Sequence, residues 1–372
     1  MRIAHVSDCY APRTGGIESQ VRSLALQQQA GGHDLRIITA TPGHEGVFAG
    51  IDEVDGLRVH RVAARVPFEL PVHPRTRLEV GRVLDDEPVD VVHVHAGVVS
   101  PFAWGAVRAA RERRVPVVVT VHSVWGPVAG PAFSLSNALA HWSRWGVNFS
   151  AVSRLAAEQI ARAVPDVGEV LVIPNGIDAS QWQVAHAGAG RDRLRVVTVM
   201  RLAPRKRTMP LLRIIAQARR ELDGRVDVSA TIVGDGPVLE RARSYVRRNG
   251  LEEAVRLTGR LNREGVRQVL GSSDVYVQPS VRESFGLAAL EARTAGLPVI
   301  VRSQSGSTQF IHDQVEGLVV DDDAGVVRAL VRLGHDRDLL DSITRHNQMT
   351  PPAEVWPQVL ESVTSAYRRA GA

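Results

Sequence analysis

Short, almost uninterrupted runs of valine, isoleucine and leucine alternate with amphipathic helical stretches along most of the chain. Runs of this kind are typical of parallel strands that helices cover on both faces of a sheet. One series fills the amino-terminal half, and a second begins with the run at 196–200. The pattern predicts an α/β fold of two Rossmann-like, doubly wound domains that face each other across a cleft.

The length of 372 residues also favours two domains, because one hydrophobic core rarely serves so long a chain. The small, glycine-rich segment Ala185–Gly190 is typical of a linker. We therefore expect one domain at 1–187 and a second at 188–372. We also expect the last helix, at about 353–369, to pack back on the N-terminal domain.

Composition excludes several classes of protein. The longest apolar run, around Val117–Val121, is far shorter than the roughly 20 residues that span a bilayer. The first residues lack the apolar core of an export signal, and the single cysteine, Cys9, forms no internal disulfide. We therefore expect a cytoplasmic protein without nucleic-acid-binding motifs. Its formal charge of +5 is compatible with a peripheral contact at the inner face of a membrane.

A basic segment follows the first strand of the second series. It runs from Arg201 to Arg207 and includes Lys206, the only lysine in the chain. A guanidinium binds a phosphate through two parallel hydrogen bonds, and an ammonium acts as a compact charge. Because the other 44 basic residues are all arginine, we interpret Lys206 as a position that arginine does not fit. We predict a diphosphate site here; the alternative is a solvated basic turn.

An acidic segment follows the predicted strand Val275–Val277. Glu283 precedes a helix that we expect to begin near Phe285, and Glu291 lies almost two turns along it. Free N–H groups at a helix start attract phosphate, and carboxylates accept hydrogen bonds from sugar hydroxyls. The two acids therefore suit two different sugars, although alone they also fit an acidic helix start followed by a surface residue.

A glycine-rich loop, Pro12-Arg13-Thr14-Gly15-Gly16, follows the first strand. Glycine permits a tight turn and a close approach of backbone N–H groups to an anion. A plain strand-to-helix turn explains this loop equally well.

Taken in order, these segments resemble the retaining glycosyltransferases of family 4, which have the GT-B architecture. Glu283 and Glu291 match the Glu-x7-Glu motif of that family. The other matching strings keep the family's order along almost the whole chain: the Gly15-Gly16 loop, Thr120-Val121-His122, Pro174-Asn175-Gly176-Ile177-Asp178, the Arg201/Lys206 segment, GDGP, TGR and AGLPV.

The resemblance implies a role for each matching position. The N–H of Gly16 lies near the donor diphosphate, and Arg201 and Lys206 bind that diphosphate and stabilise the leaving nucleotide. Glu291 binds the ribose hydroxyls, and Glu283 lies by the transferred sugar.

The remaining implied positions surround the same ligand. His122 lies over the reaction centre and bonds a hydroxyl of the donor sugar, and we place His95 beside it on the acceptor side. Further donor-binding positions are Gly259 and Arg260 along the base and Ser284, Phe285, Gly286 and Leu287 at the sugar and phosphate.

Two segments depart from the family pattern. The family often has glycine where this chain has Met200 and Arg207, which predicts a more crowded or more basic phosphate loop. Its GG-x-x-Glu turn corresponds here to Ser305–Gln309, with an amide in place of the usual acid.

The resemblance implies transfer with retention by front-face attack, without a separate protein base, a cofactor or a metal. Two Asp-x-Asp strings, Asp321–Asp323 and Asp336–Asp338, are weak metal candidates, expected in a loop and an exposed helix. His93 and His95 alternate along one strand, and a zinc pair there lacks an evident third ligand. Strand packing, with His95 facing the acceptor, is the preferred interpretation.

The acceptor side is marked less clearly. Arginines and apolar residues interleave over 58–82, where prolines interrupt any long amphipathic helix. We expect a mobile acceptor loop there, the alternative being a membrane-surface patch that serves a lipid acceptor. Trp125, Trp142 and Trp145 either line a sugar site or pack in the core.

The resemblance therefore predicts the transfer of a hexose from a UDP- or GDP-sugar to a hydroxyl of a small-molecule or lipid-linked acceptor. One alternative is a sugar-nucleotide epimerase of the same fold, which converts the donor without an acceptor. The other is a degenerate subunit that only binds the nucleotide sugar.

Overall fold

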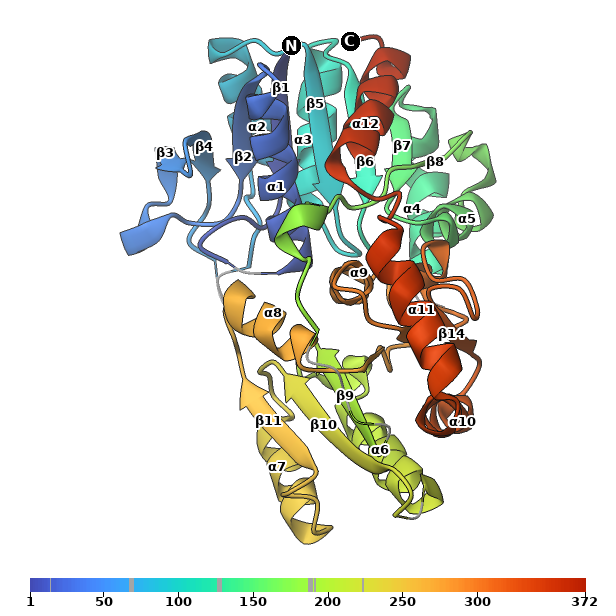
Figure 1. Ribbon diagram of the computed structural model, residues 1–372. Coiled ribbons are helices and arrows are strands. Elements are labelled where there is room, and N and C mark those ends of the chain that lie inside the picture. The colour runs from blue at the N-terminus through green and yellow to red at the C-terminus, as the bar shows by residue number, and fades with distance from the viewer. Residues whose placement is uncertain (14, 67–69, 126–128, 187–189, 191, 223) are drawn as a thin grey trace. The chain divides into compact units, whose positions relative to one another are not determined.

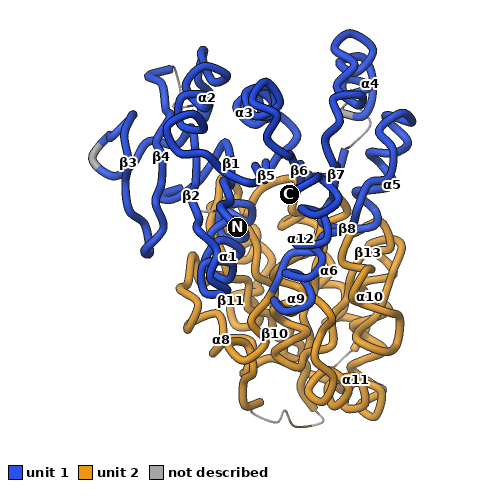
Figure 2. Tube along the Cα trace, turned by 90° about the horizontal axis from the view of Figure 1, so that it is seen from above, with its two compact units in different colours: residues 1–176, 356–372 blue, residues 177–355 orange. Residues whose placement is uncertain are grey.

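The computed structural model describes residues 1–372 except 14, 67–69, 126–128, 187–189, 191 and 223. The described chain forms two compact units. Unit 1 comprises Met1–Gly176 and Trp356–Ala372, and unit 2 comprises Ile177–Val355 (Figure 2). Each unit is a mainly parallel sheet with its own helices, as the alternating pattern predicts.

Unit 1 is built on an eight-stranded sheet with the order β3-β4-β2-β1-β5-β6-β7-β8 (Figure 1). Neighbouring strands are parallel except for the antiparallel pair β3–β4. The strands are β1 (Arg2–Ser7), β2 (Asp34–Thr39), β3 (Ala49–Val54), β4 (Leu57–Val62), β5 (Val91–Ala96), β6 (Val117–Val121), β7 (Asn148–Ala151) and β8 (Leu171–Val172).

Helices bury both faces of this sheet. Ile3 and Val118 share one apolar core with α1 and α12, whereas Val6 and Val119 share the opposite core with α2, α3 and α5. Successive strand side chains point to opposite faces, which explains why the strands read as continuous apolar runs. The helices are α1 (Gly16–Ala30), α2 (Thr76–Asp86), α3 (Pro101–Glu112), α4 (Ala129–Ala140), α5 (Arg154–Ala163) and α12 (Trp356–Ala370).

Unit 2 has a six-stranded parallel sheet with the order β11-β10-β9-β12-β13-β14. Its strands are β9 (Arg193–Val199), β10 (Asp227–Val233), β11 (Val255–Gly259), β12 (Val275–Val277), β13 (Val299–Arg302) and β14 (Gly317–Val320). Its helices are α6 (Thr208–Leu222), α7 (Leu239–Arg248), α8 (Arg263–Gly271), α9 (Leu287–Thr294), α10 (Asp323–His335) and α11 (Arg337–Met349).

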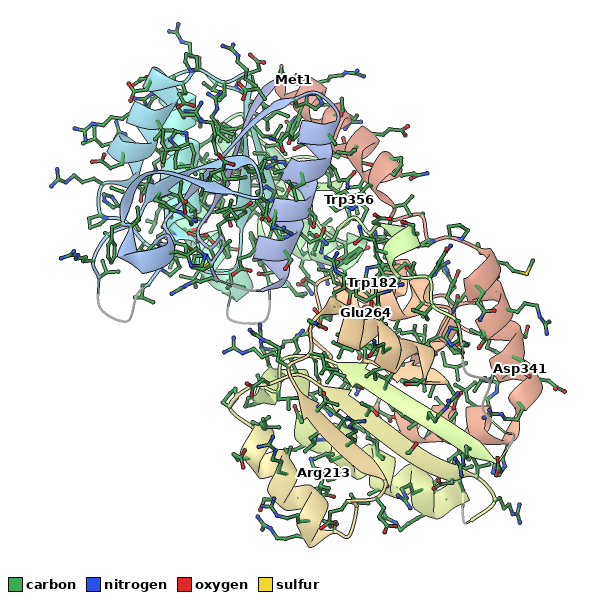
Figure 3. The ribbon with its side chains drawn as sticks, turned by 60° about the vertical axis from the view of Figure 1, so that its left-hand side comes forward. Met1, Trp182, Arg213, Glu264, Asp341 and Trp356 are labelled. Atoms are coloured by element: carbon green, nitrogen blue, oxygen red, sulfur yellow. The ribbon has the colours of Figure 1, made fainter. Side chains whose placement is uncertain are left out.

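The first unit ends at Gly176, before the boundary that the glycine-rich linker suggested near residue 187. The chain leaves and re-enters unit 1 at one place. A Cβ on Gly176 would lie 2.4 Å from the ring of Trp356, the first residue of α12 (labelled in Figure 3). Ile177 pairs with Val355. The two places where the chain crosses between the units are therefore paired with each other. Residues 187–189 of the glycine-rich segment lie outside the described residues.

The segment 58–82, where we expect an acceptor loop, is a loop only in part: the described residues 63–66 and 70–75 have no helix or strand. It contains most of β4 and the first part of α2. Arg61 is fully buried and binds Asp52 at 2.9 Å, and Arg58 binds Glu87 at 2.7 Å. Both arginines lie on β4, and each is paired with an acid from outside the segment. Residues 67–69, in the middle of the segment, lie outside the described residues. In the described part of the chain, no helix has the length and apolarity that crossing a membrane requires.

Candidate functional site

The carboxyl end of β9 carries the basic segment of unit 2. Arg201 follows the strand and is exposed, and its side chain contacts no partner among the described residues. Lys206 ends a short 3-10 turn, Pro204–Lys206, and its ammonium forms an ion pair with the carboxylate of Glu283. Both side chains of the pair are largely buried, with 21% and 17% of their surface exposed. The structure therefore brings the basic and the acidic segments of the sequence together.

Arg207 has a backbone φ of 62°, in the left-handed region that favours glycine. A glycine, which the resemblance implies at this position, would adopt this conformation without strain. The Arg207 guanidinium donates to Asp323 at 2.6 Å, and Asp323 also accepts from Arg302 at 2.7 Å. The extra charge is therefore paired with an acid at the start of α10. Sequence reasoning missed this role of Asp323, because nothing in the two segments indicates their pairing.

The GDGP turn after β10 packs tightly against the same basic segment. A Cβ on Gly234 would lie 1.9 Å from the carbonyl oxygen of Met200. The N–H of Gly234 donates to the carbonyl of Gly259 at 2.8 Å. Gly259 ends β11 with a φ of 73°, and Arg260 follows it. The turn thus places the GDGP and TGR strings next to the end of β9.

The start of α9 lies two residues later than expected. Leu287 is the first helical residue, and Gly286 precedes it with a φ of 95°. A Cβ on Gly286 would lie 2.1 Å from Ser307 Oγ, which itself donates to the carbonyl of Phe285 at 2.7 Å. Phe285 is therefore a buried loop residue that anchors the turn, with Ser284 before it. The N–H groups that begin the helix are those of Leu287 and its successor.

Glu291 is the fifth residue of α9 and is half-buried. Burial raises the pKa of its carboxyl to about 8, and the charge of Arg263 opposes this shift. Burial also raises the pKa of the Tyr276 phenol, and the charges of Glu291 and Glu283 raise it further. The phenol donates a hydrogen bond to the carbonyl of Val199 at 3.1 Å. The phenol of Tyr276 therefore ties β12 to the end of β9, and its position in a strand gave no sequence signal for this bond.

The glycine-rich loop of unit 1 leads into α1. Gly15 is the N-cap of the helix, and Gly16 is its first residue. A Cβ on Gly16 would meet no atom of the described residues within 4 Å, and the φ of Gly16 lies outside the left-handed region. Neither packing nor backbone strain therefore requires glycine at this position. Thr14, in the same loop, lies outside the described residues.

Cys9 is half-buried, and burial raises the pKa of its thiol.

His122 follows β6 and is half-buried, with its backbone N–H bound to the carbonyl of Ala96. Its Nε2 lies 3.0 Å from His95 Nδ1. His95 differs from the expectation of an acceptor-side residue: it is buried, and both its ring nitrogens bond to other histidines. The ring of His5, on β1, supplies the third histidine that the pair His93 and His95 lacked, with ring nitrogens within 4.8 Å of one another. The strings AHVS and VHVHA gave the only sequence signal, a histidine near each strand end.

Other candidates have structural roles. Asp322 caps α10 by accepting from the N–H of Gly325, and Asp336 caps α11 by accepting from the N–H of Leu339. Trp125 stacks on Phe133 with ring centroids 3.8 Å apart. The Asp-x-Asp strings therefore begin helices, and Trp125 is a core residue.

Comparison with known proteins identifies the class. Two family models match the chain, Glycosyltransferase Family 4 at residues 14–181 and Glycosyl transferases group 1 at residues 193–336. A phosphatidylinositol N-acetylglucosaminyltransferase chain of Arabidopsis thaliana is 26% identical over all of this chain and 82% of its own. The phosphatidyl-myo-inositol mannosyltransferase of Mycobacterium leprae is 29% identical over 99% of this chain and 96% of its own. Anabaena HepE, solved with UDP, has a TM-score of 0.76 at 17% identity and covers 98% of this chain and 100% of its own.

The fold, the basic loop and these relatives define a glycosyltransferase that uses sugar-nucleotide donors. The chain belongs to the family 4 glycosyltransferases with the GT-B fold.

Proposed function

We propose that the protein is a retaining hexosyltransferase that moves a sugar from a UDP- or GDP-sugar to a hydroxyl of a lipid-linked acceptor of the phosphatidylinositol type. The observation that carries the donor half is the largely buried Lys206–Glu283 ion pair. Arg201, in the same basic segment, is exposed and has no hydrogen-bond or ion-pair partner among the described residues. The acceptor half is supported by two relatives, each of which is named for phosphatidylinositol or phosphatidyl-myo-inositol.

The proposed chemistry follows from charge. Cleaving a sugar–phosphate bond leaves negative charge on the departing diphosphate. Arg201 and Lys206, held at a strand end, bind that charge, and each preorganised donor of this kind contributes about 3 kcal/mol to the stabilisation of a transition state. The N–H groups of Leu287 and Ala288, at the start of α9, add a helix dipole of the right sign.

In this proposal the two acids, Glu283 and Glu291, bind the sugar groups of the donor. Glu283 holds Lys206 in position and faces the transferred sugar, and Glu291 binds the ribose hydroxyls. Gly16 offers its N–H to the diphosphate, because no side chain of the described residues lies against its Cα. His122 bonds a hydroxyl of the donor sugar, and Gly259 and Arg260 lie along the base.

The leaving phosphate oxygen takes the acceptor proton during front-face attack, so the proposal needs no protein base. It also invokes no cofactor or metal, because Arg201 and Lys206 are proposed to supply the positive charge for the diphosphate. The protein is proposed to act at a membrane surface, where its lipid acceptor lies.

The test is release of nucleotide from a panel of UDP-, GDP- and ADP-sugars, with and without vesicles that contain phosphatidylinositol. Matched vesicles of phosphatidylserine carry the same charge without the inositol. Three results together support the proposal. Only the inositol lipid stimulates nucleotide release, EDTA does not change the rate, and NMR shows that the product keeps the anomeric configuration of the donor sugar. Isomerisation of the donor without lipid identifies an epimerase, and binding without turnover identifies a donor-binding subunit.

A further inference from the structure

Four histidines gather on one face of the unit 1 sheet, near the carboxyl ends of its central strands. His5 on β1 lies opposite His93 on β5, and His95 lies two residues further along β5. His122 follows the neighbouring strand, β6. The rings of adjacent members have centroids between 4.2 and 5.3 Å apart. Helices α1 and α12 cover this face (Figure 1).

One line of hydrogen bonds runs from His122 into the core. His122 Nε2 lies 3.0 Å from His95 Nδ1, His95 Nε2 lies 2.9 Å from His5 Nδ1, and His5 Nε2 lies 2.7 Å from Gln28 Oε1 on α1. Burial lowers the pKa of every ring in this line, so each is a neutral imidazole at physiological pH. A neutral imidazole has one N–H donor and one acceptor nitrogen. The direction of one hydrogen bond therefore fixes the direction of all three.

A second line leaves the other atom of the same carboxamide. Gln28 Nε2 lies 3.2 Å from the phenol of Tyr367 on α12, and this phenol lies 2.8 Å from His93 Nδ1. The line then continues, with separations of 2.7, 2.7 and 3.4 Å, through His93 Nε2, Thr120 Oγ1, Ser150 Oγ and the carbonyl oxygen of Val119.

The carbonyl at the end of the second line sets the direction of both. A carbonyl oxygen only accepts, so Ser150 donates to Val119 and Thr120 donates to Ser150. His93 Nε2 therefore carries the proton, and Tyr367 donates to His93 and accepts from Gln28. This arrangement turns the carboxamide oxygen of Gln28 toward His5. His5, His95 and His122 then each carry their proton on Nε2.

We propose that these two lines form a positioning relay that holds His122 in the Nε2–H tautomer and leaves its Nδ1 as an acceptor for a substrate hydroxyl. Among the described residues, no group bonds to His122 Nδ1. The proposal rests on the proposed function for the identity of that hydroxyl, a hydroxyl of the donor sugar. Gln28 is the positioning residue that matters most, because its carboxamide joins an acceptor to one line and a donor to the other.

The relay makes an all-or-none prediction about proton positions. With the direction set by Val119, all four histidines carry the proton on Nε2. If the carboxamide of Gln28 were turned the other way, all four would carry it on Nδ1, and His122 would offer a donor where the substrate needs an acceptor. A stack held together only by packing has no reason to share one tautomer.

The experiment is long-range 1H–15N NMR of the 15N-histidine-labelled full chain at pH 7.5, without ligand, with signals assigned by single histidine variants. Four Nε2-protonated rings support the relay. A proton on Nδ1 of His122, or mixed tautomers along the stack, overturns it. This measurement does not depend on sugar transfer, so a protein without transferase activity leaves the relay standing and only the proposed function fails.

Kinetics of Gln28→Leu test the link to function. We expect kcat to fall about tenfold, the loss of one hydrogen bond in the transition state, while the affinity for free nucleotide stays unchanged. His122 then shows both tautomers. Gln27→Leu, on the same helix and without a side-chain hydrogen bond among the described residues, is the matched control. Equal loss of kcat and of nucleotide affinity, or a lowered melting temperature in both variants, indicates a structural role only and contradicts the relay. If Gln28→Leu does not fold, the tautomers of the unaltered protein still decide.

Discussion

Lys206 and Glu283, 77 residues apart in the sequence, form an ion pair at the carboxyl ends of the unit 2 strands. The pair joins the one ammonium side chain of the protein to the first acid of the Glu-x7-Glu motif. A half-buried pair of this kind fixes both groups in one geometry, whereas a pair in water is mobile and contributes little. The ion pair therefore holds the ammonium in one place.

Replacing Lys206 removes this fixed charge. We expect Lys206→Ala to lower kcat at least tenfold, because one preorganised donor contributes about 3 kcal/mol. Lys206→Arg should recover only part of the loss, because a planar guanidinium does not occupy the space of an ammonium. The measurement is kcat and KM for the donor at saturating acceptor.

The matched control is Arg213→Ala on α6, an exposed cation of the same unit (labelled in Figure 3). It should leave kcat and KM unchanged. Kinetics of Lys206→Ala that match this control would remove Lys206 from the site.

Because of Glu291, we expect the free energy of unfolding of unit 2 to fall as the pH rises. Its folded pKa is about 8, above the value of 4.5 in the unfolded chain. Between these values the unfolded chain loses a proton that the folded protein keeps, so the stability of unit 2 falls as pH rises from about 4.5 to 8. Glu291→Gln removes this titration. We expect it to raise the melting temperature by a few degrees at pH 8 and by less at pH 5.

The same variant should lose donor affinity, because an amide replaces the group proposed to bind the ribose. Thermal scans at both pH values, with and without nucleotide, separate the two effects. A melting temperature of Glu291→Gln that shows the same offset at pH 5 and pH 8 contradicts the raised pKa.

Much of this arrangement was predictable from local patterns. The apolar runs around Val117 and Val196 predicted strands of the two sheets, one in each unit. The strings around Lys206 and Glu283 predicted the two segments that the ion pair joins in unit 2. Each of these signals is local, because buried parallel strands and phosphate loops depend on residues close in sequence. The start of α9 was placed two residues early because the left-handed turn at Gly286 delays the helix.

The remaining features depend on distant partners. From the sequence, Arg61 was expected at the surface. In the structure it is buried, and its charge is paired with Asp52 on β3. His95 resembled a ligand-facing residue, but its two ring nitrogens are taken by His5 and His122. In both cases a polar side chain is buried because another segment satisfies it, and sequence spacing carries no record of that segment.

The histidine stack should make unit 1 sensitive to acid. Burial lowers the pKa of His5 to about 4 and holds that of His93 well below its usual value, against 6.5 in the unfolded chain. Below pH 6.5 the histidines of the unfolded chain bind protons, whereas the buried histidines of the folded protein stay neutral. The free energy of unfolding therefore falls as the pH falls toward 4. The fully buried His5 alone accounts for about 3 kcal/mol of this loss. Asp8, with its pKa raised to about 6, acts in the opposite direction over part of this range.

Melting temperatures at pH 7, 6, 5 and 4.5 measure this loss. His93→Gln keeps a polar side chain without its own titration, and it should make the fall in stability below pH 6.5 less steep, because His5, His95 and His122 still titrate. His44→Gln, at an exposed histidine, should not. An unaltered profile in His93→Gln would show that the acid sensitivity comes from elsewhere.

The resemblance implies an acid at position 309, where this chain has Gln309. We expect the folded protein to require the amide there, because of the neighbouring carboxyl of Glu354. Gln309 hydrogen-bonds the carboxyl of Glu354, which is buried and has a raised pKa, with burial as the main cause. Gln309→Glu would place two carboxyls side by side, and like charges at this distance disfavour ionisation of both. We expect a melting temperature several degrees lower at pH 7 and close to normal at pH 5, where one carboxyl holds a proton and donates it to the other. Adding Glu354→Gln exchanges donor and acceptor and should restore stability at pH 7, so the double-mutant cycle should show strong coupling. Additive effects of the two substitutions would mean that the amide was not selected by Glu354.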